Sequence, residues 1–278
     1  MYLWKFWVLL RIVFDLISGV RMSKNIVSIG TSFIWIIAYL IVCGIIPAIL
    51  NRGIFRFANK ELAAWLNLST LVILNYVFIF KLTDRYHLKI KIFSNISLKG
   101  ILLAVGCSVL FYLLLDKFLD PIFDSIFTSS AEAYKHNVRQ LMQFPFANFI
   151  RICLIAPLAE EILIRGCILE ALQKNYSVFT ALLISSLLFA VLHFNFVQTL
   201  SALICGLILG LLYINTKSLF SCILAHFLYN AFSYLAIICN NKSWCNNYVW
   251  FLPIIKYILV MILKLKSAGF AYNRNSLF

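Results

Sequence analysis

The chain has 278 residues, of which 63% are hydrophobic and only 12% are charged. Because a soluble domain is about half apolar and about a quarter charged, this composition excludes a soluble globular protein and indicates a polytopic membrane protein. The formal net charge of +14 does not point to a nucleic-acid partner. Most lysines and arginines lie between apolar segments, where they suit anionic lipid headgroups and fix topology.

Residues 1–20 form an apolar segment that is interrupted by Lys5, Arg11 and Asp15, and no small-residue cleavage site follows it. A cleaved signal peptide is therefore not expected. Arg11 and Asp15 are four residues apart, so the segment either lies in the membrane interface with one polar stripe or forms a short first span. The sequence leaves both alternatives open.

Eight later apolar runs are long enough to cross a hydrocarbon core of about 30 Å. They cover residues 26–50, 62–82, 98–119, 149–172, 177–193, 196–214, 219–238 and 248–265. The first three are predicted to be scaffold helices without acidic or basic residues in their interiors. The more polar residues 120–145 are predicted to form a surface loop with an interfacial or amphipathic helix. We therefore predict an all-α membrane bundle of about eight transmembrane helices, or nine if residues 1–20 also span.

The basic residues favour one orientation of this bundle. If residues 18–25 are cytoplasmic, alternate connections place ten further basic residues on the same side: Lys81, Arg85, Lys89, Lys91, Lys99, Lys174, Lys217, Lys264, Lys266 and Arg274. Cytoplasmic connections carry an excess of lysine and arginine. We expect a multi-pass integral membrane protein with a cytoplasmic N-terminus, located in the plasma membrane if the source is a bacterium.

The fourth run contains two adjacent carboxylates and an arginine, in the order Glu160-Glu161-Ile162-Leu163-Ile164-Arg165. Ionisable groups at membrane depth are costly unless they are paired or wetted, so they indicate a functional site. Glu161 and Arg165 are four residues apart and share a helical face, so they can form a pair. Glu160 is rotated by about 100° from Glu161 and is left to face another partner.

Two histidines and an asparagine also interrupt apolar runs. His193 lies near the end of one run, and His226 and Asn230 lie four residues apart on one face of another. One intramembrane histidine is often only a hydrogen-bonding residue between helices, but polar groups on three helices should converge on a wet interior pocket. Glu160 and His193 are suited to activate a water molecule, and His226 and Asn230 to stabilise the oxyanion of peptide-bond hydrolysis.

Three motifs in this order resemble those of the CPBP family, which comprises the CAAX proteases and bacteriocin-processing (Abi) enzymes and includes the Ras-converting type II CAAX prenyl endopeptidases. The motifs are Glu160-Glu161-x-x-x-Arg165, Phe189-x-x-x-His193 and His226-x-x-x-Asn230. The resemblance implies an intramembrane endopeptidase of about eight transmembrane helices, with a site that opens toward the cytoplasm and the bilayer. The roles that it implies are water activation by Glu160 and His193, oxyanion binding by His226 and Asn230, and support by Glu161 and Arg165.

The resemblance also suggests a division of the chain. We predict a single membrane domain over residues 1–278, with scaffold helices and an interfacial loop in residues 1–145. Residues 146–240 are predicted to form the catalytic core, and residues 246–278 a final helix and basic tail.

The family's description as metalloproteases raises the alternative of a zinc site. Glu160, His193 and His226 are of the types that supply three ligands and leave a fourth position open. The chain has no HExxH pair, which would place two ligands and a base on one helix. The resemblance itself favours a metal-free mechanism that depends on the glutamate, with no cofactor and with zinc as the alternative.

Two other classes of function compete with the protease hypothesis. One is a non-catalytic immunity or scaffold protein of the same fold, and the other is a proton-coupled transporter that uses the buried charges as a relay. A transporter more naturally shows repeated halves and broken helices, which the sequence lacks. The expected partners are the lipid bilayer and a membrane-associated peptide or protein substrate. The sequence leaves open whether that substrate is prenylated.

Overall fold

The computed structural model describes residues 27–240. The predicted N-terminal segment and the predicted span at 248–265 lie outside the described residues. The chain divides into two compact units, residues 1–231 and 232–278. The helices described below belong to the first unit, except for the end of the last one. The predicted division at residues 145 and 240 stays a prediction.

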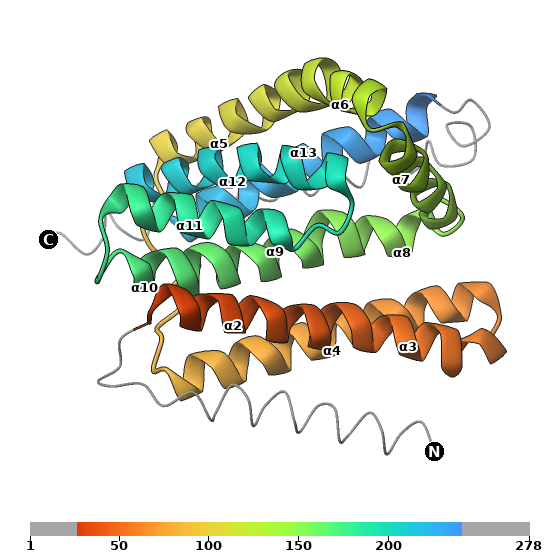
Figure 1. Ribbon diagram of the computed structural model, residues 1–278, viewed down its shortest axis with the longest axis horizontal. Coiled ribbons are helices and arrows are strands. Elements are labelled where there is room, and N and C mark those ends of the chain that lie inside the picture. Colours follow the sequence, from red (N-terminus) through yellow and green to blue (C-terminus); the bar gives the residue numbers. More distant parts are fainter. Residues whose placement is uncertain (1–26, 241–278) are drawn as a thin grey trace, which may run out of the picture. The chain divides into compact units, whose positions relative to one another are not determined.

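Every regular element of residues 27–240 is helical, as predicted (Figure 1). The first helix begins after Ser28, whose side chain accepts a hydrogen bond from the backbone N–H of Thr31 and so caps it. Asn59 caps the next long helix in the same way. These elements are α2 (Ile29–Tyr39), η1 (Leu40–Ile45), α3 (Ile46–Gly53), η2 (Phe55–Phe57) and α4 (Lys60–Arg85).

The middle of the chain forms a second group of helices. Its first long helix starts at a serine cap, Ser97. The predicted polar loop is largely helical: residues 120–126 extend the preceding span, and a separate polar helix follows. The elements are α5 (Leu98–Phe111), η3 (Tyr112–Leu119), α6 (Asp120–Ile126) and α7 (Thr128–Leu141).

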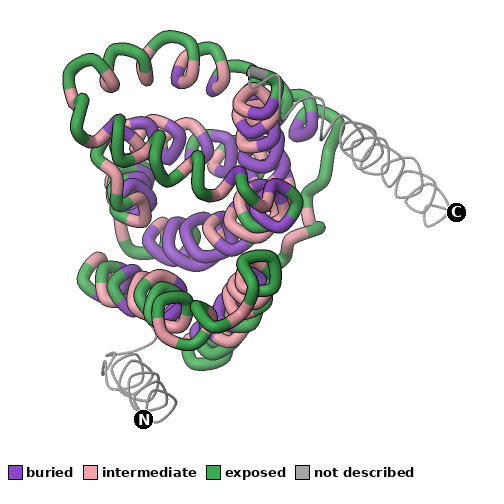
Figure 2. Tube along the Cα trace, turned by 90° about the vertical axis from the view of Figure 1, so that its right-hand side faces the viewer, coloured by how far each residue is buried: buried purple, intermediate pink, exposed green. Residues whose placement is uncertain are grey.

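One long helix, residues 145–172, carries the glutamate motif and is here called the site helix. It consists of α8 (Pro145–Phe149), η4 (Ile150–Ile155), α9 (Ala156–Glu161), η5 (Ile162–Leu169) and α10 (Glu170–Leu172). The helices that pack around it are α11 (Val178–Val191), α12 (Phe196–Thr216) and α13 (Leu219–Asn240). Figure 2 shows that buried residues line the facing sides of these helices.

Three π-helical segments, which are wider than an α-helix, end shortly before a proline. Pro47, Pro121 and Pro157 follow η1, η3 and η4 by two residues each. Proline lacks the N–H group that bonds to the preceding turn, and its ring displaces the carbonyl four residues earlier. The backbone relieves this conflict by widening the turn before the proline. The sequence therefore encodes these irregular turns locally.

Five described helices are long and apolar enough to cross a membrane: Ile29–Phe57, Lys60–Arg85, Leu98–Ile126, Phe196–Thr216 and Leu219–Cys239. The predicted count of eight is thus not confirmed. The helix at Val178–Val191 is apolar but short, and the site helix contains five charged residues. Both can still lie within a bundle, because neighbouring helices shield them from lipid.

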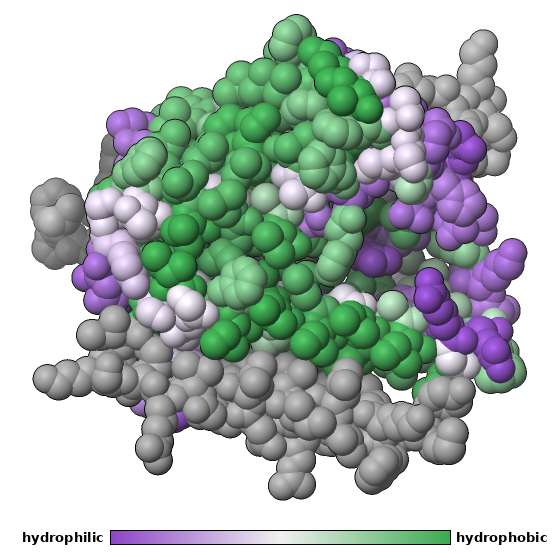
Figure 3. All heavy atoms as spheres, in the orientation of Figure 1, coloured by the Kyte–Doolittle hydropathy of each residue, from purple (hydrophilic) through white to green (hydrophobic). Residues whose placement is uncertain are grey.

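The outer surface is apolar, as a protein in lipid requires. On the face shown in Figure 3, apolar residues form a broad area over the helices, and polar residues gather toward its margins. Large side chains such as Phe80 and Leu102 are more than half exposed. In water such a surface would favour aggregation, whereas in a bilayer it contacts the hydrocarbon core. The protein is an integral membrane protein.

Candidate active site

The centre of the site is a buried network of three charged or titratable side chains. Oε1 of Glu161 accepts hydrogen bonds from Nη1 of Arg165 at 2.8 Å and from Nδ1 of His226 at 2.9 Å. Glu161 and Arg165 are 0% and 1% exposed. The spacing of four residues predicts the first contact. The second joins the site helix to α13, and it assigns the Nδ1 proton to His226, because the carboxylate can only accept.

Arg165 links this network to two further helices. Its Nη2 atom donates to the carbonyl oxygen of Gly206 on α12 at 3.0 Å, and its guanidinium carbon lies 4.7 Å from the ring centre of Phe189 on α11. A Cβ atom at Gly206 would lie 3.1 Å from Cα of Ser186. Glycine is needed here because α12 approaches the backbone of α11 this closely.

Phe189 is the ring shared by both histidines. Its centre lies 5.3 Å from that of His193 and 5.7 Å from that of His226, with edge-to-face geometry in both cases. Nδ1 of His193 lies 3.2 Å from the Phe189 carbonyl oxygen. A carbonyl only accepts, so His193 carries its proton on Nδ1, and its Nε2 lone pair is free to take a proton.

Glu160 differs sharply from its neighbour. Its side chain is partly exposed rather than buried, and among residues 27–240 it makes no ion pair or hydrogen bond. It lies within electrostatic range of the Tyr39 hydroxyl on α2, which itself donates to Asn75. Adjacent glutamates thus occupy two environments, one buried and ion-paired through Oε1 and one accessible. His193 and Asn230 are also partly exposed.

Asn230 fastens α13 to the site helix. Its Nδ2 atom donates to the carbonyl oxygen of Ile152 at 2.9 Å. In the π-helical pattern the N–H of Ala156 bonds to the carbonyl of Arg151, so Pro157 would be the next donor, but it has no N–H. The amide of Asn230 supplies the missing donor. Since an amide has two N–H groups, the other remains for a ligand.

The zinc alternative finds no assembled ligand set. Within the described residues, no group of three or more His, Cys, Asp and Glu side chains is placed to hold a metal ion. The candidate set of Glu160, His193 and His226 is therefore not gathered in this conformation.

Sequence reasoning missed an acidic cluster beside the site. The span at 98–119 was predicted to have no charged interior, yet Asp116 lies within it and accepts a hydrogen bond from the Tyr229 hydroxyl at 2.9 Å. Asp120, one turn on, accepts from Ser201. Burial and these carboxylates raise the pKa of Tyr134 on α7 to about 12, so its hydroxyl stays protonated. An acid within an apolar run was the signal that would have found Asp116.

The site lies away from the basic end of the bundle. His193 follows the end of α11, and Asn195 beside it donates to the Ser130 carbonyl of α7. Lys174 precedes the opposite end of α11. An opening at the His193 end would therefore face away from the side that the lysines mark as cytoplasmic. The distribution of basic residues and the cytoplasmic opening that the resemblance implies therefore place this end of the site on opposite sides of the membrane.

Residues 142–232 match a family model described as type II CAAX prenyl endopeptidase Rce1-like. The matched range contains the whole site helix, α11, α12, the first part of α13 and all three motifs. Comparison with curated proteins and with solved structures gives no match for this chain. The match agrees with the resemblance drawn from the motifs: residues 142–232 are similar to the Rce1-like type II CAAX prenyl endopeptidases.

Proposed function

We propose that this protein is an intramembrane endopeptidase that hydrolyses a peptide bond of a membrane-associated protein or peptide. The observation that carries the proposal is the contrast between an accessible Glu160 and the buried Glu161–Arg165–His226 network beside it. A buried ion pair that is also hydrogen-bonded fixes the positions of the helices that carry it. The unpaired carboxylate on the next residue is then available for chemistry.

In the proposed reaction, Glu160 and the free Nε2 of His193 bind and deprotonate a water molecule. The water oxygen attacks the scissile carbonyl carbon, and the carbonyl becomes a tetrahedral oxyanion. Collapse of this intermediate breaks the C–N bond, and the proton taken from water passes to the leaving amine. The carboxyl product keeps the water oxygen.

His226 and Asn230 are proposed to bind the oxyanion. Because Nδ1 of His226 is engaged by Glu161, Nε2 can donate only when the ring is protonated. Asn230 contributes its remaining N–H. Fixed donors in a site that excludes water stabilise the developing charge strongly.

The family description points to a prenylated CAAX-type substrate, cut after the modified cysteine. An apolar exterior and a site within the bundle suit a substrate whose lipid group stays in the bilayer. A non-catalytic immunity or scaffold role, or proton transport, would use the same fold without cleavage. The cleavage assay separates these functions.

The test uses the purified full chain in liposomes with matched peptides that carry a prenylated or an unmodified cysteine. Cleavage by the native protein, lost in Glu160→Gln and His193→Ala but retained in the presence of a strong zinc chelator, is the expected result. Loss on chelation with recovery on added zinc would replace the metal-free mechanism. Unchanged cleavage by Glu160→Gln would reject the proposed role of that carboxylate.

A further inference from the structure

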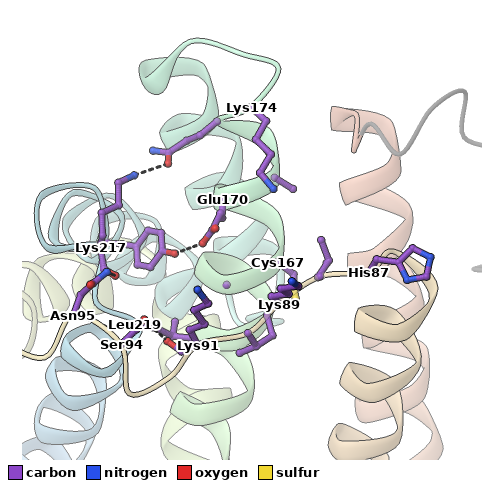
Figure 4. A pocket seen from close by; sticks show the side chains of 16 residues that line it. His87, Lys89, Lys91, Ser94, Asn95, Cys167, Glu170, Lys174, Lys217 and Leu219 are labelled. Atoms are coloured by element: carbon purple, nitrogen blue, oxygen red, sulfur yellow. Dashed lines mark hydrogen bonds between the residues drawn. The ribbon is translucent and has the colours of Figure 1, made fainter.

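A cavity of about 640 Å³ lies at the basic end of the helices, apart from the catalytic residues. Four segments of the first unit line it: the connection 86–97, the end of the site helix, the end of α12 and the start of α13 (Figure 4). None of the catalytic candidates is among its lining residues. The cavity has no role in the proposed protease reaction.

The cavity is strongly basic. Lys89, Lys91, Lys174 and Lys217 line it, with Glu170 as the one carboxylate. The Tyr213 hydroxyl donates a hydrogen bond to Oε2 of Glu170, so one oxygen of this carboxylate is already engaged. Figure 4 shows Lys91 and Lys174 directing their amino groups into the space from opposite sides.

Three of these lysines have no protein partner in the described part of the chain. Lys217 donates to Oε1 of Gln173 at 2.9 Å. Lys89, Lys91 and Lys174 make no hydrogen bond or ion pair with any residue of 27–240. Three unpaired ammonium groups around one cavity repel one another and favour a bound anion.

The backbone around the cavity is held in an unusual conformation. His87, Asn95 and Lys217 have φ angles of 52°, 56° and 50°, and they are the non-glycine residues with positive φ among those described. All three line the cavity. Nδ2 of Asn95 donates to the Lys217 carbonyl at 3.0 Å and fastens the 86–97 connection to the end of α12. The segments that carry Lys89, Lys91 and Lys217 are therefore held by specific backbone contacts and are not a loose loop.

Apolar side chains adjoin the cavity in the sequence. Phe93, between Lys91 and Ser94, is 74% exposed, and Phe179, at the start of α11, is 73% exposed. In a membrane protein, such rings at a polar helix end suit contact with the acyl region next to the headgroups. A ligand with an anionic head and apolar chains fits this combination, whereas a soluble anion would use only the lysines.

We propose that this cavity binds the phosphate headgroup of an anionic phospholipid, with its acyl chains along the apolar helices. The phosphate oxygens accept from the ammonium groups of Lys89, Lys91 and Lys174, and lysine acts here as a point charge. This proposal does not depend on the proposed protease function.

The test is native mass spectrometry of the full chain in neutral detergent, titrated with phosphatidylglycerol and with phosphatidylcholine of the same acyl chains. The native protein should retain phosphatidylglycerol preferentially. The triple variant Lys89→Gln/Lys91→Gln/Lys174→Gln should weaken that retention by on the order of tenfold or more. Arg52→Gln/Arg56→Gln/Lys60→Gln removes the same charge from residues outside the cavity and should leave it unchanged.

Three outcomes would overturn the proposal. These are equal retention of both lipids by the native protein, equal loss in both triple variants, and displacement of the lipid by inorganic phosphate alone at millimolar concentration. The last would mean that the cavity takes a soluble anion. A fourth outcome, displacement by a peptide that ends in a free carboxylate, would also overturn the proposal and would assign the cavity to a substrate. Thermal unfolding of both variants in lipid-free detergent should match the native protein, which excludes misfolding as the cause.

Discussion

The side chain of Asn230 takes the place of the backbone donor that Pro157 lacks. Its Nδ2 atom donates at 2.9 Å to the carbonyl of Ile152, which the π-helical pattern would pair with the residue at position 157. A proline in the site helix and an asparagine on α13 are thus one structural device. It holds α13, and with it His226, against the helix that carries both glutamates.

A double substitution tests this device. Asn230→Ala leaves the Ile152 carbonyl without a donor and should destabilise the protein by about 1–3 kcal/mol. Pro157→Ala restores an N–H at that position, so the double variant Pro157→Ala/Asn230→Ala should recover much of the lost stability. Thermal unfolding in detergent measures both. Peptide cleavage should not recover in the double variant if Asn230 also binds the oxyanion, whereas full recovery would make its role purely structural.

The two adjacent glutamates should respond oppositely to the same change. Glu161→Gln leaves Arg165 buried without its counter-charge and should cost about 3–5 kcal/mol of stability. Glu160→Gln alters a partly exposed group without a described partner, so stability should hardly change while cleavage falls by about 10²–10⁴-fold. Unfolding curves and cleavage rates of the two variants, taken together, check this. Equal destabilisation would contradict the assignment of roles.

Gly206 should be intolerant of a single added methyl group. A Cβ atom there would lie 3.1 Å from Cα of Ser186, so Gly206→Ala must move α11 and α12 apart and shift the carbonyl that accepts from Arg165. We expect destabilisation of about 1–3 kcal/mol. At Gly106 an added Cβ meets nothing within 4 Å. Gly106→Ala is therefore the matched control and should be neutral or stabilising by up to about 1 kcal/mol.

Phe189 is expected to stabilise the protein through the contacts of its aromatic ring, and not only through the volume of its side chain. Phe189→Leu removes the surface on which Arg165 and both histidines pack, and should destabilise the protein by about 2 kcal/mol or more. Phe179→Leu changes the same residue type at an exposed position and should have little effect. The unfolding midpoints of the two variants test this prediction. Similar midpoints would contradict a stabilising role of the Phe189 ring.

The hydrogen bond from Tyr229 to Asp116 should stabilise the helix that carries His226. Tyr229→Phe removes the hydroxyl while keeping the ring, and should cost about 1.5–3 kcal/mol because the acceptor is a carboxylate. Tyr112→Phe, on η3, serves as the control because no described group bonds to its hydroxyl. Unfolding measured at neutral pH tests this, and no difference between the variants would argue against the bond.

The sequence alone determined the class of protein and the local part of the site. An apolar composition requires a membrane, because exposed apolar surface on this scale is not stable in water. The pairing of Glu161 with Arg165 follows from a spacing of four residues, which places both on one face of any helix. The order of the three motifs likewise indicated the family that residues 142–232 match.

Only the tertiary structure decided which helices meet and what each polar group contacts. Spacing could not tell that His226 bonds to Glu161 rather than Glu160, or that Asn230 reaches Ile152, since these contacts join distant segments. Nor could hydropathy count the spans, because a short helix and a charged helix can both be shielded by their neighbours. Contacts within one turn are set by helical geometry, whereas contacts between helices depend on the packing of whole faces.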